Sequence, residues 1–146
     1  MYRGHIIPLV ALLLLVVGIL AGCGGPAKGS AEWHADQGYK LFNQGNYDEA
    51  IKECTEAIEL APDFAEAYSN RGIAYVQKGE LDQAIADFDK AIELDPELAK
   101  TYHNRGYAYY LKGEVAKAVS DFEKCIELSN DPRLVAKAQQ LLDEIR

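Results

Sequence analysis

The sequence contains few of the residues from which metal sites, disulfide scaffolds and catalytic centres are usually built. Its 146 residues include only three cysteines and three histidines. Three cysteines are too few for the disulfide framework of a small secreted domain, and their spacing does not match a metal site. Neither His34 nor His103 belongs to a His-Glu-x-x-His motif. This composition predicts no metal and no cofactor.

Basic residues are also scarce. The chain has 15 Lys and Arg against 23 Asp and Glu, which gives a formal net charge of −8. The basic residues are scattered, so no patch offers the phosphate contacts on which nucleic-acid affinity depends. We therefore expect no nucleic-acid partner, and we attribute the acidity to solubility.

Acidic residues occur in close pairs, but their spacing does not favour acid–base catalysis. Asp87 and Asp89, like Glu93 and Asp95, lie two residues apart in segments with a helical pattern. Residues at this spacing on a helix face different directions. No strand pattern is evident, and no glycine-rich loop follows one. The sequence predicts a non-catalytic protein without a small-molecule substrate.

The first 22 residues differ from the rest of the chain. Arg3 is their only charged residue, residues 9–21 are apolar, and Gly22 precedes Cys23. This order of a positive start, an apolar middle and small residues is typical of a secretory signal. The apolar run is short for a membrane span, which needs ~20 residues. If the apolar run is counted over 6–22, its length becomes marginal for a membrane span. The alternative is therefore a signal that is not cleaved and stays as an inner-membrane anchor.

The end of this segment resembles the lipobox of bacterial lipoproteins, with Leu20-Ala21-Gly22-Cys23 as its four residues. The resemblance implies cleavage of residues 1–22 and acylation of Cys23, which would anchor the protein in a membrane of the cell envelope. Two or three acyl chains suffice, because each buried methylene contributes ~0.8 kcal/mol. Residues 23–30 have the composition of a flexible tether. Gly24 replaces the Asp that retains some lipoproteins at the inner membrane, which weakly favours an outer membrane if the organism has one.

A single fixed period dominates the remainder of the chain. The interval from Gly38 to Gly72 equals the interval from Gly72 to Gly106, and Ala50, Ala84 and Ala118 keep the same spacing. A fixed period of about 34 residues is typical of a helical repeat array. The pattern predicts paired helices over the following ranges: 31–44 with 47–60, 65–78 with 81–94, and 99–112 with 115–128. Gly45, Gly79 and Gly113 separate the helices of each pair, where a left-handed conformation favours glycine.

These positions resemble the tetratricopeptide repeat, with units at 31–64, 65–98 and 99–132. The resemblance implies an all-α solenoid of three helix-turn-helix repeats. Small residues occupy the positions where helices cross closely. They are Gly38, Ala50, Ala57, Gly72, Ala84, Ala91, Gly106 and Ala118. Residues 133–146 carry one further amphipathic pattern, with Leu134, Ala138, Leu141, Leu142 and Ile145 at helical spacing. We interpret this segment as a helix that caps the last apolar face.

A second pattern joins the two helices of each unit. Gln37, Arg71 and Arg105 recur in the first helices, and Glu53, Asp87 and Asp121 follow them at one constant offset in the second helices. We predict ion pairs Arg71–Asp87 and Arg105–Asp121, with Gln37–Glu53 as a neutral analogue. Cys54 and Cys125 occupy apolar positions two repeats apart, so we expect free buried thiols.

In the resembled family the first helices line a concave face, which implies a groove for an extended peptide or a helix. Its predicted lining combines aromatic residues with amide and basic side chains. The residues are Tyr39, Phe42, Ser69, Asn70, Ile73, Gln77, Lys100, His103, Asn104, Tyr107 and Tyr110.

One subfamily binds the C-terminal carboxylates of heat-shock chaperones through a clamp of Lys, Asn and Arg. Asn70 and Lys100 match this clamp, whereas Ala35, Tyr39 and Asn104 do not. We therefore do not expect that role. The sequence as a whole predicts a membrane-tethered scaffold or adaptor for an unidentified protein partner. The alternative is a structural subunit that assembles with itself through an uncovered end of the array.

Overall fold

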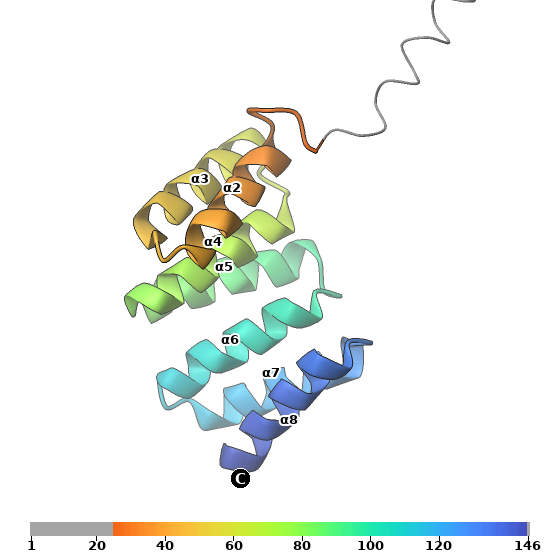
Figure 1. Cartoon of the computed structure of the whole chain (residues 1–146). Helices are drawn as coiled ribbons and strands as arrows, with labels where there is room; N and C mark the ends of the chain where they lie inside the picture. Colours follow the sequence, from red (N-terminus) through yellow and green to blue (C-terminus); the bar gives the residue numbers. More distant parts are fainter. Residues whose placement is uncertain (1–24, 146) are drawn as a thin grey trace, which may run out of the picture.

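The computed structural model describes residues 25–145, and in this range the chain forms seven α-helices and no strand. Figure 1 shows them stacked as successive pairs, which is the all-α solenoid that the repeat predicts. The first pair is α2 (Ala31–Asn43) with α3 (Tyr47–Leu60), the second is α4 (Ala65–Lys78) with α5 (Leu81–Leu94), and the third is α6 (Ala99–Leu111) with α7 (Val115–Leu128). α8 (Pro132–Ile145) follows. The proposed signal and Cys23 lie outside the described residues.

The turns within the pairs explain where the first helices end. Gly45, Gly79 and Gly113 have φ angles of 83°, 76° and 77°, so each is left-handed as expected. α2 and α6 end at Asn43 and Leu111, one residue earlier than predicted, because Gln44 and Lys112 are their C-caps. The second helices α3 and α5 end shortly before Pro62 and Pro96, which prevent their continuation.

Small side chains allow the paired helices to approach closely. All eight glycines and alanines predicted at the helix crossings are buried. A Cβ atom built on Gly72 would lie 2.6 Å from Cε1 of Phe88, and one on Gly106 would lie 2.9 Å from Cε1 of Phe122. Both phenylalanine rings are fully buried. The glycines on α4 and α6 therefore provide the space into which the rings of α5 and α7 pack.

Two part-buried arginines fix the register between helices and between repeats. Arg71 donates from Nε and Nη2 to the carboxylate of Asp87, each at 2.8 Å, and Arg105 makes the same two bonds to Asp121. Each arginine also reaches back one repeat, Arg71 to Thr55 Oγ1 at 3.1 Å and Arg105 to Asp89 at 2.6 Å.

The first repeat differs from the prediction. Glu53 contacts Nδ1 of His34 at 2.8 Å. The predicted Gln37–Glu53 analogue was wrong, because the imidazole of His34, about one helical turn earlier than Gln37, takes the carboxylate.

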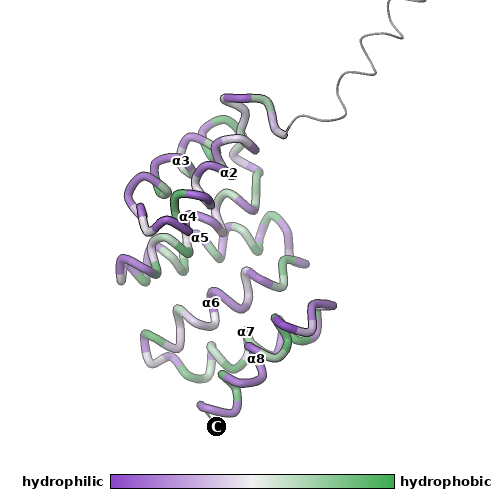
Figure 2. The backbone as a smooth tube through the Cα atoms, viewed as in Figure 1, coloured by the Kyte–Doolittle hydropathy of each residue, from purple (hydrophilic) through white to green (hydrophobic). Residues whose placement is uncertain are grey.

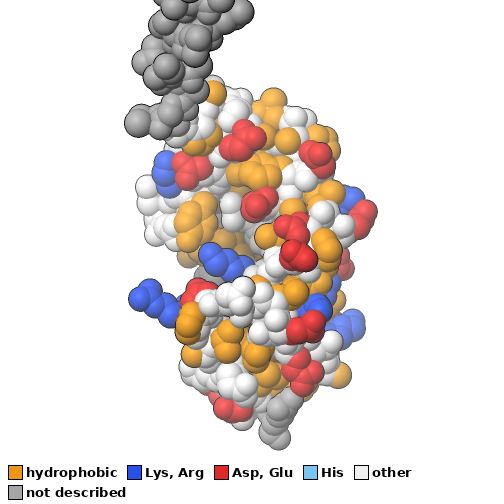
Figure 3. Space-filling model, turned by 90° about the vertical axis from the view of Figure 1, so that its right-hand side faces the viewer, with side chains coloured by type: hydrophobic (Ala, Val, Ile, Leu, Met, Phe, Trp, Pro, Cys, Tyr) orange, Lys and Arg blue, Asp and Glu red, His pale blue; other side chains and the backbone are white. Residues whose placement is uncertain are grey.

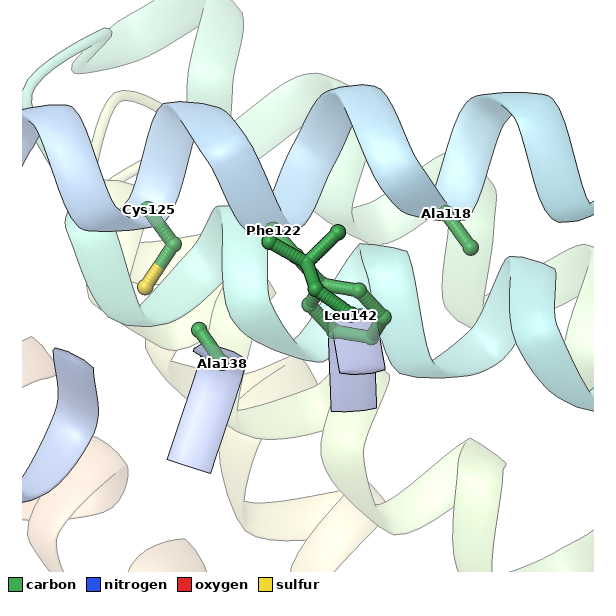
Figure 4. Close-up of a cluster of buried hydrophobic side chains, with 5 residues drawn as sticks. All are labelled: Ala118, Phe122, Cys125, Ala138 and Leu142. Atoms are coloured by element: carbon green, nitrogen blue, oxygen red, sulfur yellow. The ribbon is translucent and has the colours of Figure 1, made fainter. Parts of the chain in front are cut away.

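α8 covers the end of the array, as the amphipathic pattern predicts. Ala138 and Leu142 pack against Ala118, Phe122 and Cys125 of α7 (Figure 4). Figure 2 shows hydrophobic and hydrophilic stretches alternating along α7 and α8. The helix begins at Pro132, where the missing N–H of proline costs nothing. None of the helices between residues 25 and 145 is long and apolar enough to cross a membrane.

Candidate functional site: a groove across the first helices

A groove of about 740 Å³ crosses α2, α4, α6 and the start of α8. Packing of α2 against α4 and of α4 against α6 aligns the first helices side by side. Ten of the eleven predicted groove residues line it. They are Tyr39, Phe42, Ser69, Asn70, Ile73, Gln77, Lys100, His103, Asn104 and Tyr107. Tyr110 does not line the groove; it follows Tyr107 on α6, with its ring centroid 6.4 Å from that of Tyr107.

The contribution of α8 is the part that the sequence analysis missed. Arg133, Leu134 and Lys137 line the groove from the first two turns of this helix. The apolar stripe of α8 predicts only its packing on α7, and so only its role as a cap. The signal that could have revealed the second role is the spacing of Arg133 and Lys137, which places them on one side of the helix.

The two ends of the groove differ in chemistry. α6 and α8 both pack on α7, and Figure 1 shows that they run in the same direction. Lys100, Arg133 and Lys137 all lie in the first two turns of these two helices. The large aromatic residues Tyr39 and Tyr107 lie in the later turns of α2 and α6. The groove therefore has a basic end at the N-termini of the helices and an aromatic end toward their C-termini.

The tyrosine rings at the aromatic end of the groove are exposed and can contact a ligand. Tyr39 is 48% exposed and Tyr107 is 37% exposed. Asn70 and Asn104, in the second turns of α4 and α6, also line the groove and are half-buried. The tyrosine rings can bury apolar side chains of a ligand, and the amide groups can exchange hydrogen bonds with its main chain. Together these two kinds of contact suit an extended peptide. Among residues 25–145 no cluster of His, Cys, Asp and Glu is placed to hold a metal ion.

His103 is the most unusual polar group of the groove. Its Nε2 atom is buried without a hydrogen-bond partner, while Nδ1 lies 3.4 Å from Oδ1 of Asn104. Its ring packs on Phe122 with centroids 5.7 Å apart. Burial lowers the pKa of His103 below its usual value, and the charge of Lys137 acts in the same direction.

His103 is expected to make the protein less stable in mild acid. In the unfolded chain the histidine binds a proton near its ordinary pKa, whereas the folded chain binds it only at lower pH. The unfolded state thus holds more protons below about pH 6.5, and stability falls as the pH drops through that value. Urea unfolding at pH 7.5 and 5.5 should show a larger loss for the wild type than for His103→Leu. Equal losses would contradict the assignment.

Cys54 and Cys125 are free, buried thiols, as the sequence analysis expected. Burial raises the pKa of Cys54 to about 12 and that of Cys125 to about 11. Because the thiolate is the reactive form, we expect neither to react with a maleimide at pH 7.5 in the folded protein, and both to react after unfolding in urea. Peptide mass mapping of the labelled sites checks this. Rapid labelling of either site in the folded state would contradict the burial described here.

Family-wide patterns match the repeats directly. A model of the TPR repeat matches residues 38–79 and 73–113, and a model of the tetratricopeptide repeat matches 99–131. The search of curated proteins returned no match.

Solved structures with the same fold are numerous. The second TPR domain of Spaghetti (RPAP3), bound to the HSP90 peptide SRMEEVD, is 31% identical, with a TM-score of 0.66 over 68% of this chain and 92% of that one. The TPR2B domain of yeast Sti1, in complex with pHsp70, is 30% identical, with a TM-score of 0.75 over 79% of this chain and 94% of that one. MamA is 34% identical, with a TM-score of 0.62 over 68% of this chain and 54% of that one.

The matches to the repeat models indicate one family. The stacked helix pairs and the groove on the first helices are consistent with it. Its fold is typically a non-catalytic module for protein interaction. The chain belongs to the tetratricopeptide repeat family.

Proposed function

We propose that this protein is a non-catalytic adaptor that holds a protein partner by a peptide or helix bound in its groove. The observation that carries the proposal is the groove itself, which gathers exposed tyrosines and amide side chains from three successive repeats. The second TPR domain of Spaghetti (RPAP3), which has the same fold, is bound to a peptide in its solved structure, and this supports a peptide ligand here.

The heat-shock peptide of the relatives is a poor candidate for the ligand. Only Asn70 and Lys100 match the carboxylate clamp of that subfamily. Ala35 occupies one of the remaining clamp positions, where it is 4% exposed and packs with Ala57 and Ala67. A buried alanine offers no charge to a terminal carboxylate, so we expect a different peptide.

A membrane tether completes the proposal. Cys23 ends a segment with the layout of a lipoprotein signal, and residues 23–30 separate it from α2. The adaptor would then be anchored by lipid in the cell envelope, facing the periplasm or the exterior. The mass of the detergent-extracted protein tests this directly. We expect residues 1–22 to be absent and Cys23 to be acylated, whereas an unmodified full-length mass would contradict the lipid anchor.

Capture of the partner in cells tests the groove. We compare the tagged wild type with a Tyr39→Ala, Tyr107→Ala variant after chemical cross-linking. Tyr110→Ala is the matched control, because Tyr110 is 36% exposed, close to the 37% of Tyr107, but lies outside the groove lining. A defined partner lost only in the groove variant supports the proposal. Capture of this protein alone, equally in all three, would favour the self-assembling subunit instead.

A further inference from the structure

Three cations of the groove have no ion-pair partner among the described residues. They are Lys100 on α6 and Arg133 and Lys137 on α8, and all three side chains are exposed. Most other cations between residues 31 and 145 do pair, as Arg71 does with Asp87, Lys78 with Asp48 and Lys112 with Glu114. Carboxylates are abundant in a chain with a net charge of −8, yet among the described residues none forms an ion pair with these three cations.

Few acidic groups share the basic end of the groove. The two lining carboxylates are Glu66 and Asp131. Oδ1 of Asp131 accepts a hydrogen bond from the backbone N–H of Arg133 at 2.9 Å, so this carboxylate is engaged at the start of α8. Figure 3 shows Lys and Arg side chains beside a hollow at about mid-height, with an acidic side chain next to them, and further charged side chains of both signs elsewhere on that face.

The three cations lie on one side of the groove. α6 and α8 run in the same direction, and each cation lies in the first two turns of its helix. His103 from the second turn of α6 and Lys137 from the second turn of α8 line the same groove. The hydroxyl of Thr101 donates to Ser69 Oγ at 3.0 Å and so joins the same end of α6 to α4. The basic end thus takes its cations from α6 and α8 and borders α4.

We propose that this basic end binds acidic side chains of the partner peptide, while the aromatic end takes its apolar residues. This rests on the proposed function and adds the chemistry of the partner. A concave surface of one charge raises the local concentration of the opposite charge and fixes the direction of a bound chain. The neighbouring amides of Asn70 and Asn104 and the rings of Tyr39 and Tyr107 suit a polypeptide rather than a flat lipid surface. α8 is then a recognition helix as well as a cap.

Selection of peptides from a random dodecamer phage library on the full chain tests this. One variant removes the charges with Lys100→Gln, Arg133→Gln and Lys137→Gln. The control variant makes the same change in net charge on α3, α5 and α7, with Lys52→Gln, Lys90→Gln and Lys124→Gln. We expect the wild type and the control to select peptides enriched in Asp and Glu. The groove variant should lose the enrichment and bind the selected peptides about tenfold more weakly, because each exposed ion pair contributes little alone.

Glu66→Gln is a variant in which we expect affinity to rise. It removes a carboxylate from the groove lining, so it should bind the same peptides more tightly. Selection without acidic enrichment, or unchanged enrichment in the groove variant, would overturn the inference. If those peptides still require Tyr39 and Tyr107, the groove function stands and only the charge assignment fails. If no peptide requires the groove, the proposed function fails too. Phosphatidylglycerol vesicles that bind in a manner dependent on these cations, without any such peptide, would assign the basic end to the membrane and overturn the inference.

Discussion

Replacing Asp87 by alanine is expected to lower the free energy of unfolding by about 3 kcal/mol. The side chains of Arg71 and Asp87 are only 18% and 9% exposed, so the substitution leaves a guanidinium in the helix interface without its carboxylate. Thr55 remains as an acceptor but carries no charge. Folded domains have about 5–15 kcal/mol in total, so urea unfolding followed by circular dichroism should show a large shift of the midpoint.

Two further variants show whether stability is lost because the ion pair is removed or because an unpaired charge is left buried. Arg71→Met combined with Asp87→Leu removes both charges and should recover most of the lost stability. Asp36→Ala breaks an exposed ion pair, in which the side chain of Asp36 is 45% exposed and that of Lys40 is 56% exposed. This variant should lower the free energy of unfolding by less than about 1 kcal/mol. If Asp87→Ala costs no more than Asp36→Ala, the register role of Arg71 is contradicted.

Gly72→Ala is expected to destabilise the protein by about 2 kcal/mol, because the extra methyl overpacks the interface of α4 and α5. Its Cβ atom would lie 2.6 Å from Cε1 and 2.9 Å from Cδ1 of Phe88, whose ring is fully buried. The sign is informative. In an exposed helix interior the same substitution would stabilise by about 1 kcal/mol, since alanine is the better helix former. Thermal unfolding of the two proteins measures the difference.

Phe88→Leu tests the cause, because leucine leaves room where the ring edge was. In that background Gly72→Ala should be neutral or stabilising, which a double-mutant cycle would register as favourable coupling. Equal effects of Gly72→Ala in both backgrounds would show that the close approach of Gly72 and Phe88 does not explain the glycine at this position.

Much of the fold follows from local signals in the sequence. Gly72 and Gly106 are glycine because phenylalanine rings fill the space beside them, and Gly79 and Gly113 are glycine because the turns are left-handed. A close approach at the glycine of the first helix and a left-handed turn recur in each unit, although Gly38 faces Cys54 and not a phenylalanine. One fixed period therefore predicts both the helices and their order. The Arg–Asp pairs could be predicted for the same reason, since the same offset between the two residue types is repeated in two units.

The features that the sequence analysis missed depend on contacts that no repeat encodes. His34, rather than Gln37, reaches Glu53 in the first unit, where no arginine competes for the carboxylate. α8 departs from the repeat pattern, so its position over the groove follows from how Ala138 and Leu142 seat on α7. The contribution of Arg133 and Lys137 to the groove becomes visible only when that packing is known.

Site-selective photo-cross-linking tests the central claim, that the groove binds the partner, most directly. p-Benzoylphenylalanine is placed in turn at Tyr39, Tyr107 and Leu60, and the cells are irradiated. Leu60 is the control, because it is 56% exposed on α3 and does not line the groove. We predict adducts to one and the same partner protein from Tyr39 and Tyr107, and none from Leu60. Adducts that form equally well from Leu60, or only between copies of this chain, would contradict the account.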